Sequence, residues 1–347
     1  MLVDSPPEQR AETAPAPPTR RAIRALGLLV SLVILLLVAL ASIAIGAKEL
    51  PLDQVWHGLF HDTGTYGDVV VDTRLSRTVL GLLAGAALGL SGAVLQALTR
   101  NPLADPGLLG INAGASAAVV TAITYFGVST LSGYVWFAFF GAAAVGALVW
   151  FLGGSRGATP VRLALAGTAI SAALYGYLQA VMITDDAALN KLRFWTVGSL
   201  ASASNSTILQ VLPFLAAGTL LALGLARPLN AVAMGDDTAR ALGANLNRTR
   251  ALAMLAATVL CGAATAACGP IAFVGLMVPH VVRSFTGPDL RWILPYATVL
   301  SPVLLLGADV VGRVVARPAE LQVGIVTAII GGPVFILLVR RRRTAQL

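Results

Sequence analysis

The sequence predicts an all-α protein that crosses a membrane many times. Hydrophobic residues make up 57% of the 347 residues and charged residues only 12%, about half the charged share usual in soluble domains. The charged side chains lie mostly in short gaps between long apolar runs, and 22 of the 24 basic residues are arginine. The mean hydropathy of +0.81 agrees with this pattern. These observations predict a multi-pass protein of the cell membrane, inner or plasma, in contact with lipid.

Nine apolar runs are long enough to cross the ~30 Å hydrocarbon core of a bilayer as helices. They lie at residues 26–46, 78–98, 107–127, 133–152, 161–183, 207–226, 251–268, 292–312 and 324–339. A tenth, shorter run at 270–282 contains Pro279, so we expect one short broken helix there, buried in protein or lining a cavity.

The distribution of arginine predicts the topology. If the short tenth run crosses, both chain ends lie on the same side, and that side holds most of the arginines, including Arg24 and the four at 340–343. This is the bias expected of cytoplasmic segments. We therefore expect ten transmembrane helices within 23–340 and both termini in the cytoplasm. The Pro-rich segment 1–22 is expected to be a disordered cytoplasmic tail, and 341–347 a basic cytoplasmic end.

Several function classes are excluded by what the sequence lacks. Neither lysine lies in a G-x-x-x-x-G-K-[ST] loop, so the chain has no nucleotide site of this type. The predicted spans hold almost no ionisable side chain near their centres, which disfavours an ion-coupled carrier. The net charge of +8 is explained by the cytoplasmic gaps rather than by nucleic-acid binding. We expect no catalytic residue, no metal site and no cofactor, and the energy for any uphill transport would have to come from a partner.

The segment 227–250 is the longest structured segment expected on the cytoplasmic side. Asp236 and Asp237 follow Gly235 and suit the positive end of a short helix, and Gly243 can end it. We interpret this segment as a compact surface element that fits a groove in a partner subunit. The alternative is an ordinary solvated connector.

The chain resembles the type II ABC importer permeases for iron–siderophore, haem and vitamin B12 (FecCD-type). The resemblance extends over about residues 25–340, and one departure is Ser76, where the family usually has proline. The motifs that carry it are Arg74-Leu75-Ser76-Arg77, Gln96-Ala97-Leu98, the stretch NPLADPGLLG at 101–110, FWTVGSL at 194–200, TARALG at 238–243, GPIAFVGLMVPHVVR at 269–283, Gly307-Ala308-Asp309 and AELQVGIVTAIIGGP at 319–333.

The resemblance implies a permease that pairs with a second permease, identical or homologous, around a central pathway. Two ATP-binding subunits would dock on the cytoplasmic side and an extracytoplasmic substrate-binding protein on the other. We predict that the substrate is an iron–siderophore chelate, with cobalamin or haem as alternatives within the family. A stand-alone secondary carrier or channel is the alternative from another class.

The resemblance also assigns roles to particular residues. Arginines at the positions of Arg74, Arg77 and Arg313 face acidic residues of the binding protein; the alternative is anchoring of helix ends, with Arg313 paired to Asp309 one turn away. Three polar residues are candidates for lining the pathway: Gln96, Asn112 and Gln179. The alternative is that they form hydrogen bonds between helices. The residues expected to contact the ATPase subunits are Asp236, Asp237, Thr238, Arg240, Leu242 and Gly243.

Overall fold

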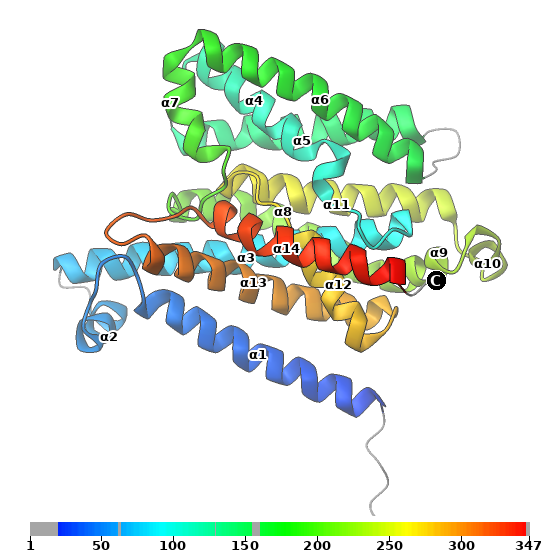
Figure 1. Ribbon diagram of the computed structural model, residues 1–347, viewed down its shortest axis with the longest axis horizontal. Coiled ribbons are helices and arrows are strands. Elements are labelled where there is room, and N and C mark those ends of the chain that lie inside the picture. The colour runs from blue at the N-terminus through cyan, green and yellow to red at the C-terminus, as the bar shows by residue number, and fades with distance from the viewer. Residues whose placement is uncertain (1–19, 62–63, 129, 155–159, 345–347) are drawn as a thin grey trace, which may run out of the picture.

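The computed structural model describes residues 20–61, 64–128, 130–154 and 160–344, and these residues form a bundle of helices without strands (Figure 1). The helices are α1 (Arg20–Ala44), α2 (Leu52–Phe60), α3 (Tyr66–Thr99), the 3-10 turn η1 (Pro106–Leu109), α4 (Ile111–Phe126), α5 (Leu131–Gly154), α6 (Pro160–Thr184), α7 (Asp186–Trp195), α8 (Asn205–Gly224), α9 (Ala226–Ala233), α10 (Asp236–Ala241), α11 (Leu246–Cys268), α12 (Val274–Thr286), α13 (Leu290–Val315) and α14 (Val323–Thr344).

Each of the ten predicted apolar runs corresponds to one of these helices. Among the described residues, seven helices are long and apolar enough to cross a membrane, and two shorter apolar helices lie at Ile111–Phe126 and Val323–Leu337. Helix α12, which matches the tenth run, has 13 residues and contains Pro279. The all-helical, multi-pass architecture is confirmed, whereas the tenfold crossing stays a prediction.

Three helices extend beyond the predicted apolar runs into polar segments. Helix α3 begins at Tyr66 rather than near residue 78, since Thr65 and Asp68 form a capping box at its start. Helix α1 begins at Arg20, so the end of the predicted tail 1–22 is helical, and 1–19 lie outside the described residues. Helix α14 continues through residues 341–344, since arginine is a good helix former; residues 345–347 of the predicted basic end lie outside the described part.

Helix α3 lies at the centre of the bundle and contacts α13, α11 and α12 closely. In its most apolar window 78% of the residues are buried. Glycines allow this contact, because a side chain on Gly85 would overlap with the backbone of Pro302, and one on Gly92 would overlap with the carbonyl of Gly275. Small residues of this kind are what bring helices together in lipid, where apolar burial gives little preference.

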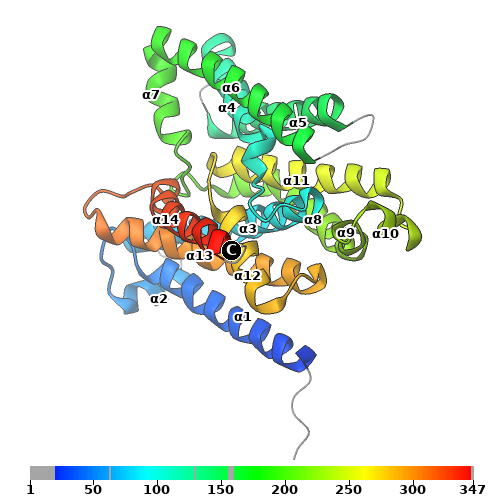
Figure 2. The same cartoon turned by 45° about the vertical axis from the view of Figure 1, so that its right-hand side comes forward.

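The two ends of the bundle differ in their connecting elements. Helices α9 and α10 lie at one end, together with the start of α1 and the end of α14, and α2 and α7 lie at the opposite end (Figure 1). The view in Figure 2 shows the same separation of α10 from α2 and α7. We call the end with α10 the inner end and the other the outer end. Helices α2 and α7 were not predicted, because both are short and lie in polar gaps.

Candidate functional site

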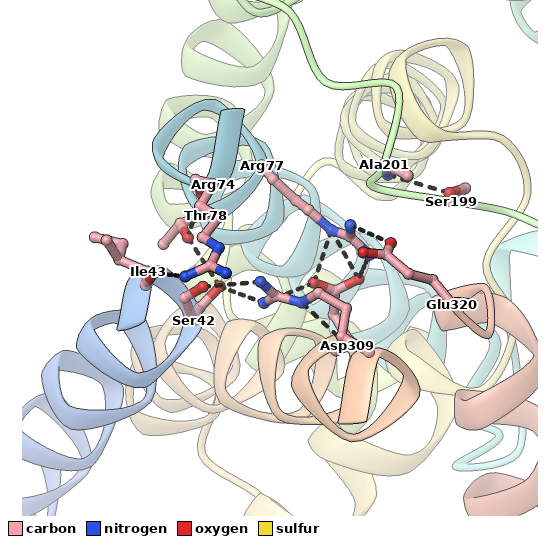
Figure 3. Close-up of polar contacts among 10 residues, drawn as sticks. Ser42, Ile43, Arg74, Arg77, Thr78, Ser199, Ala201, Asp309 and Glu320 are labelled. Carbon is pink, nitrogen blue, oxygen red and sulfur yellow. Dashed lines mark hydrogen bonds and ion pairs between the residues drawn. The ribbon is translucent and has the colours of Figure 1, made fainter. Parts of the chain in front are cut away.

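At the outer end, four charged side chains from α3, α13 and the segment before α14 form one group, which we call the outer charge cluster: Arg77, Asp309, Arg313 and Glu320 (Figure 3). Arg77 donates through Nη2 to Asp309 Oδ1 at 2.7 Å and through Nε to Oδ2 at 3.0 Å. Its Nη1 donates to Glu320 Oε2 at 2.6 Å. The guanidinium of Arg77 therefore holds α13 and the segment before α14 against α3.

Arg313 contacts the same carboxylate from the other side. Its Nη2 lies 3.0 Å from Asp309 Oδ2, and its Nη1 donates to the backbone oxygen of Ser42 at 2.9 Å. The Arg313–Asp309 pair, which the alternative interpretation expected, is thus present. Asp309, whose side chain is fully buried, is shared by two arginines, and this arrangement compensates for the cost of burying its charge.

Arg74 lies one turn before the cluster and binds the end of α1. Its guanidinium donates to the backbone oxygen of Ile43 at 3.1 Å (Figure 3). It also donates to the backbone oxygens of Ala44 at 2.9 Å and Lys48 at 2.5 Å. The last carbonyls of a helix have no partner within the helix and carry its negative dipole end. Arg74 therefore caps α1 with both hydrogen bonds and charge.

The docking role expected for Arg74, Arg77 and Arg313 stays a prediction. In the structure these three residues are buried, at 5%, 6% and 1% exposed. The sequence could not show this, because Arg77 meets Asp309 and Glu320 only after more than 200 intervening residues. Glu320 was not predicted as a site residue. Its position in an outer gap that also holds arginines could have indicated an ion pair.

At the inner end, α9 and α10 form a compact element against the start of α11. Helix α10 begins after Gly235, whose φ is +117°, and Gly243 follows it with a φ of +78°, so both glycines fulfil the predicted start and stop. Ala239 packs with Val232 and Leu246 in a small apolar cluster separate from the main core. The predicted short helix is confirmed.

The six residues predicted to contact the ATPase subunits divide into two sets. Five of them are exposed: Asp237, Thr238, Arg240, Leu242 and Gly243. Asp237 and Arg240 form an exposed ion pair at 3.3 Å. Asp236 is only about one third exposed and pairs with Arg100 and Arg250. Burial opposes its ionisation, but the hydrogen bonds from Arg100 and Arg250 outweigh that effect and lower its pKa.

A cavity of about 1100 Å³ lies beside this element. Met234 and Leu242 line it from the α9–α10 side, Arg248 from α11, and Asp289 and Arg291 from the start of α13. Asp289 caps α13, and hydrogen bonds from Arg291, with a further one from Asn230, lower its pKa to about 2 although partial burial opposes this. The inner end thus offers a hollow with apolar walls and charged margins.

The three pathway candidates lie in different surroundings. Gln96 is buried and donates to the backbone oxygen of Leu276 at 3.0 Å, and Asn112 accepts a hydrogen bond from Thr265 at 2.9 Å. Both therefore join helices, as the alternative interpretation expected. Gln179 on α6 is exposed and Asn112 partly so, and Gln179 is therefore the most accessible of the three side chains.

A helical membrane bundle with a compact polar element at one end has the architecture of a transport permease. Residues 34–341 match the FecCD transport family. The chain belongs to this family, and it is the permease subunit of an ABC importer, a multi-pass protein of the inner or plasma membrane in which ATP hydrolysis is left to other subunits.

Individual relatives agree with this assignment. The chain is 49% identical over 328 residues to the ferric enterobactin transport system permease protein FepD of Escherichia coli (strain K12), covering 93% of this chain and 96% of that protein. It is 38% identical to the hemin transport system permease protein HmuU of Yersinia pestis, covering 90% and 94%. A solved structure of an inward-facing metal-chelate type ABC transporter has a TM-score of 0.80 and 28% identity, covering 91% of this chain and 99% of that one.

Proposed function

We propose that this permease forms the pathway for an iron–siderophore chelate, together with a second permease subunit, identical or homologous. The observation that carries the proposal is the 49% identity, over almost the whole of both chains, to a permease for ferric enterobactin. A permease for hemin is also similar, at 38% identity, so haem is the second candidate. Cobalamin remains a family-level alternative without a specific observation in its favour.

In this proposal the inner end faces the cytoplasm and the chain crosses the membrane ten times. Two ATP-binding subunits dock against α9 and α10, where Asp237, Thr238, Arg240, Leu242 and Gly243 are exposed. The adjoining hollow of about 1100 Å³ supports this, because its mixed apolar and charged lining suits a protein surface. Gln179 faces the pathway, whereas Gln96 and Asn112 contribute to it indirectly by fixing the helices around it.

At the outer end we propose that an extracytoplasmic binding protein docks over the outer charge cluster. Arg77 already has an acidic partner in Glu320, whose side chain is about one third exposed. A carboxylate of the binding protein takes the place of Glu320 on Arg77, since the planar guanidinium donates hydrogen bonds readily to carboxylates. Arg74 and Arg313 support this contact by fixing α1 and α13. Exchange of one partner for another suits a complex that must dissociate in every cycle.

The decisive experiment is reconstitution of the permease with its ATP-binding subunits and binding protein in liposomes. We expect ATP-dependent uptake of a ferric siderophore that exceeds uptake of haem and of cobalamin. Preferential uptake of haem would replace the substrate assignment. Uptake without ATP or ATP-binding subunits would contradict the importer assignment and favour a stand-alone carrier or channel.

A further inference from the structure

The attachment of α10 to the bundle depends on one carboxylate. We propose that Asp236 does not contact the ATPase subunits but positions α10, through a bridge from Arg100 at the end of α3 to Arg250 in α11. The proposal rests on the coupling role proposed above for α9 and α10, and it changes the role of one residue of that set. We call the three side chains the Arg100–Asp236–Arg250 bridge.

Arg100 is placed for this role by an unusual backbone conformation. It follows the last residue of α3 with a φ of +50°, in the left-handed region that residues other than glycine seldom adopt. From there its Nε donates to the backbone oxygen of Val232 in the last turn of α9 at 2.8 Å. Its Nη2 donates to Asp236 in the first turn of α10. The side chain of Arg100 thus contacts both α9 and α10.

Arg250 completes the bridge from the second turn of α11. Its Nη2 donates to Asp236 Oδ1 at 2.9 Å and to Oδ2 at 2.8 Å. The side chain of Arg250 is 13% exposed, that of Asp236 34% and that of Asp237 100%. Screening by water is therefore weaker in the bridge than in the neighbouring Asp237–Arg240 pair.

Little else connects α10 to the bundle. It has six residues, of which only Ala239 is buried, and that residue packs in a cluster with only two other buried residues. Helix α3, in contrast, runs for 34 residues through the centre of the bundle. It carries Arg100 at its inner end and Arg77, in the outer charge cluster, near its outer end. A displacement of α10 is therefore passed by the bridge to α3 and α11 together.

The test compares Asp236→Asn with the control variant Asp186→Asn, an exposed aspartate in the first turn of α7, in the complete reconstituted complex. Asn keeps the size of the side chain but loses the charge that binds both arginines. For Asp236→Asn we expect assembly and ATP hydrolysis to persist, while chelate uptake per ATP falls by about tenfold, an effect on the scale of one charge-assisted hydrogen bond. Asp186→Asn should leave uptake per ATP unchanged, and Asp236→Glu should restore most of it.

Two outcomes would overturn the proposal. If Asp236→Asn retains normal uptake per ATP, the bridge does not transmit movement. If it instead weakens binding of the ATPase subunits while uptake per ATP hydrolysed stays normal, Asp236 is a contact residue. Should Asp236→Asn fail to fold, Arg100→Gln decides the question, since it breaks the same bridge from α3. Failure of the unaltered complex to import any chelate would contradict the proposed function. A failure of the proposed function is therefore distinguished from a failure of the proposed role of Asp236.

Discussion

The two ends of α3 carry similar ion pairs in different surroundings. At the outer end Arg77 and Arg313 share Asp309, and the side chains of this triad are no more than 7% exposed. At the inner end Arg100 and Arg250 share Asp236, with side-chain exposures between 13% and 38%. A buried charge that loses its partner is costly, whereas a partly exposed one is compensated by water. The comparison predicts that loss of the outer triad costs more stability than loss of the inner bridge.

The largest effect is expected from Asp309→Ala, which leaves two buried arginines without their shared carboxylate. Breaking a buried ion pair in this way costs about 3–5 kcal/mol. Thermal unfolding of the detergent-solubilised protein, followed by size-exclusion chromatography, should show a large loss of the folded fraction. Asp236→Ala is the matched inner variant and should cost markedly less, so equal losses would contradict the distinction between the two ends.

A smaller but clear loss of stability is expected from Gly92→Val in α3. The added side chain would overlap with the backbone carbonyl of Gly275 in α12, and overpacking of this kind costs about 1–3 kcal/mol. Gly307→Ala in α13 is the control, because a methyl group there meets no atom within 4 Å. If both variants unfold at the temperature of the unaltered protein, the close contact of α3 with α12 is not a source of stability.

A moderate change in affinity is expected at the outer end from Glu320→Gln. Removal of this charge frees Arg77 for a carboxylate of the binding protein, while Asp309 still holds the arginine in place. Docking should tighten by about threefold, which corresponds to an exposed ion pair of under 1 kcal/mol. Surface plasmon resonance with the binding protein measures the change, and weaker or unaltered docking would count against the exchange of partners proposed for Arg77.

The smallest effect concerns pH at the start of α13. The pKa of Asp289 in the folded protein is about 2, below its ordinary value of 3.8. Its contribution to stability is therefore complete above about pH 4 and is lost as the pH falls toward 2. Because the Asp289–Arg291 pair is partly exposed to water, the loss should stay below about 1 kcal/mol. Thermal unfolding between pH 5 and pH 3 should show a steeper loss for the unaltered protein than for Asp289→Asn.

The sequence predicted those parts of the structure that depend on neighbouring residues. Apolar runs identified the long helices, and Gly235 and Gly243 marked the start and end of α10. The spacing of four suggested the Arg313–Asp309 pair, as the alternative to docking. Contacts between distant segments could not be read in this way. Asp236 and Asp237 are adjacent and look equivalent in the sequence. In the structure Asp236 pairs with Arg100, which lies 136 residues earlier. Likewise, the burial of Arg74 and Arg77 depends on where α1 and α13 end in space.

The contacts of the α1 carboxyl end have a consequence for biosynthesis. In its most apolar window only 11% of the residues of α1 are buried, so this helix has few partners to hold it when it enters the bilayer. Arg74, 30 residues after Ala44, supplies the first cap as soon as α3 is inserted, and such short-range contacts form early. Arg313 reaches Ser42 across 271 residues. The first two long helices can therefore form a hairpin during translation, and the outer end of α1 acquires its last contact only when most of the chain has left the ribosome.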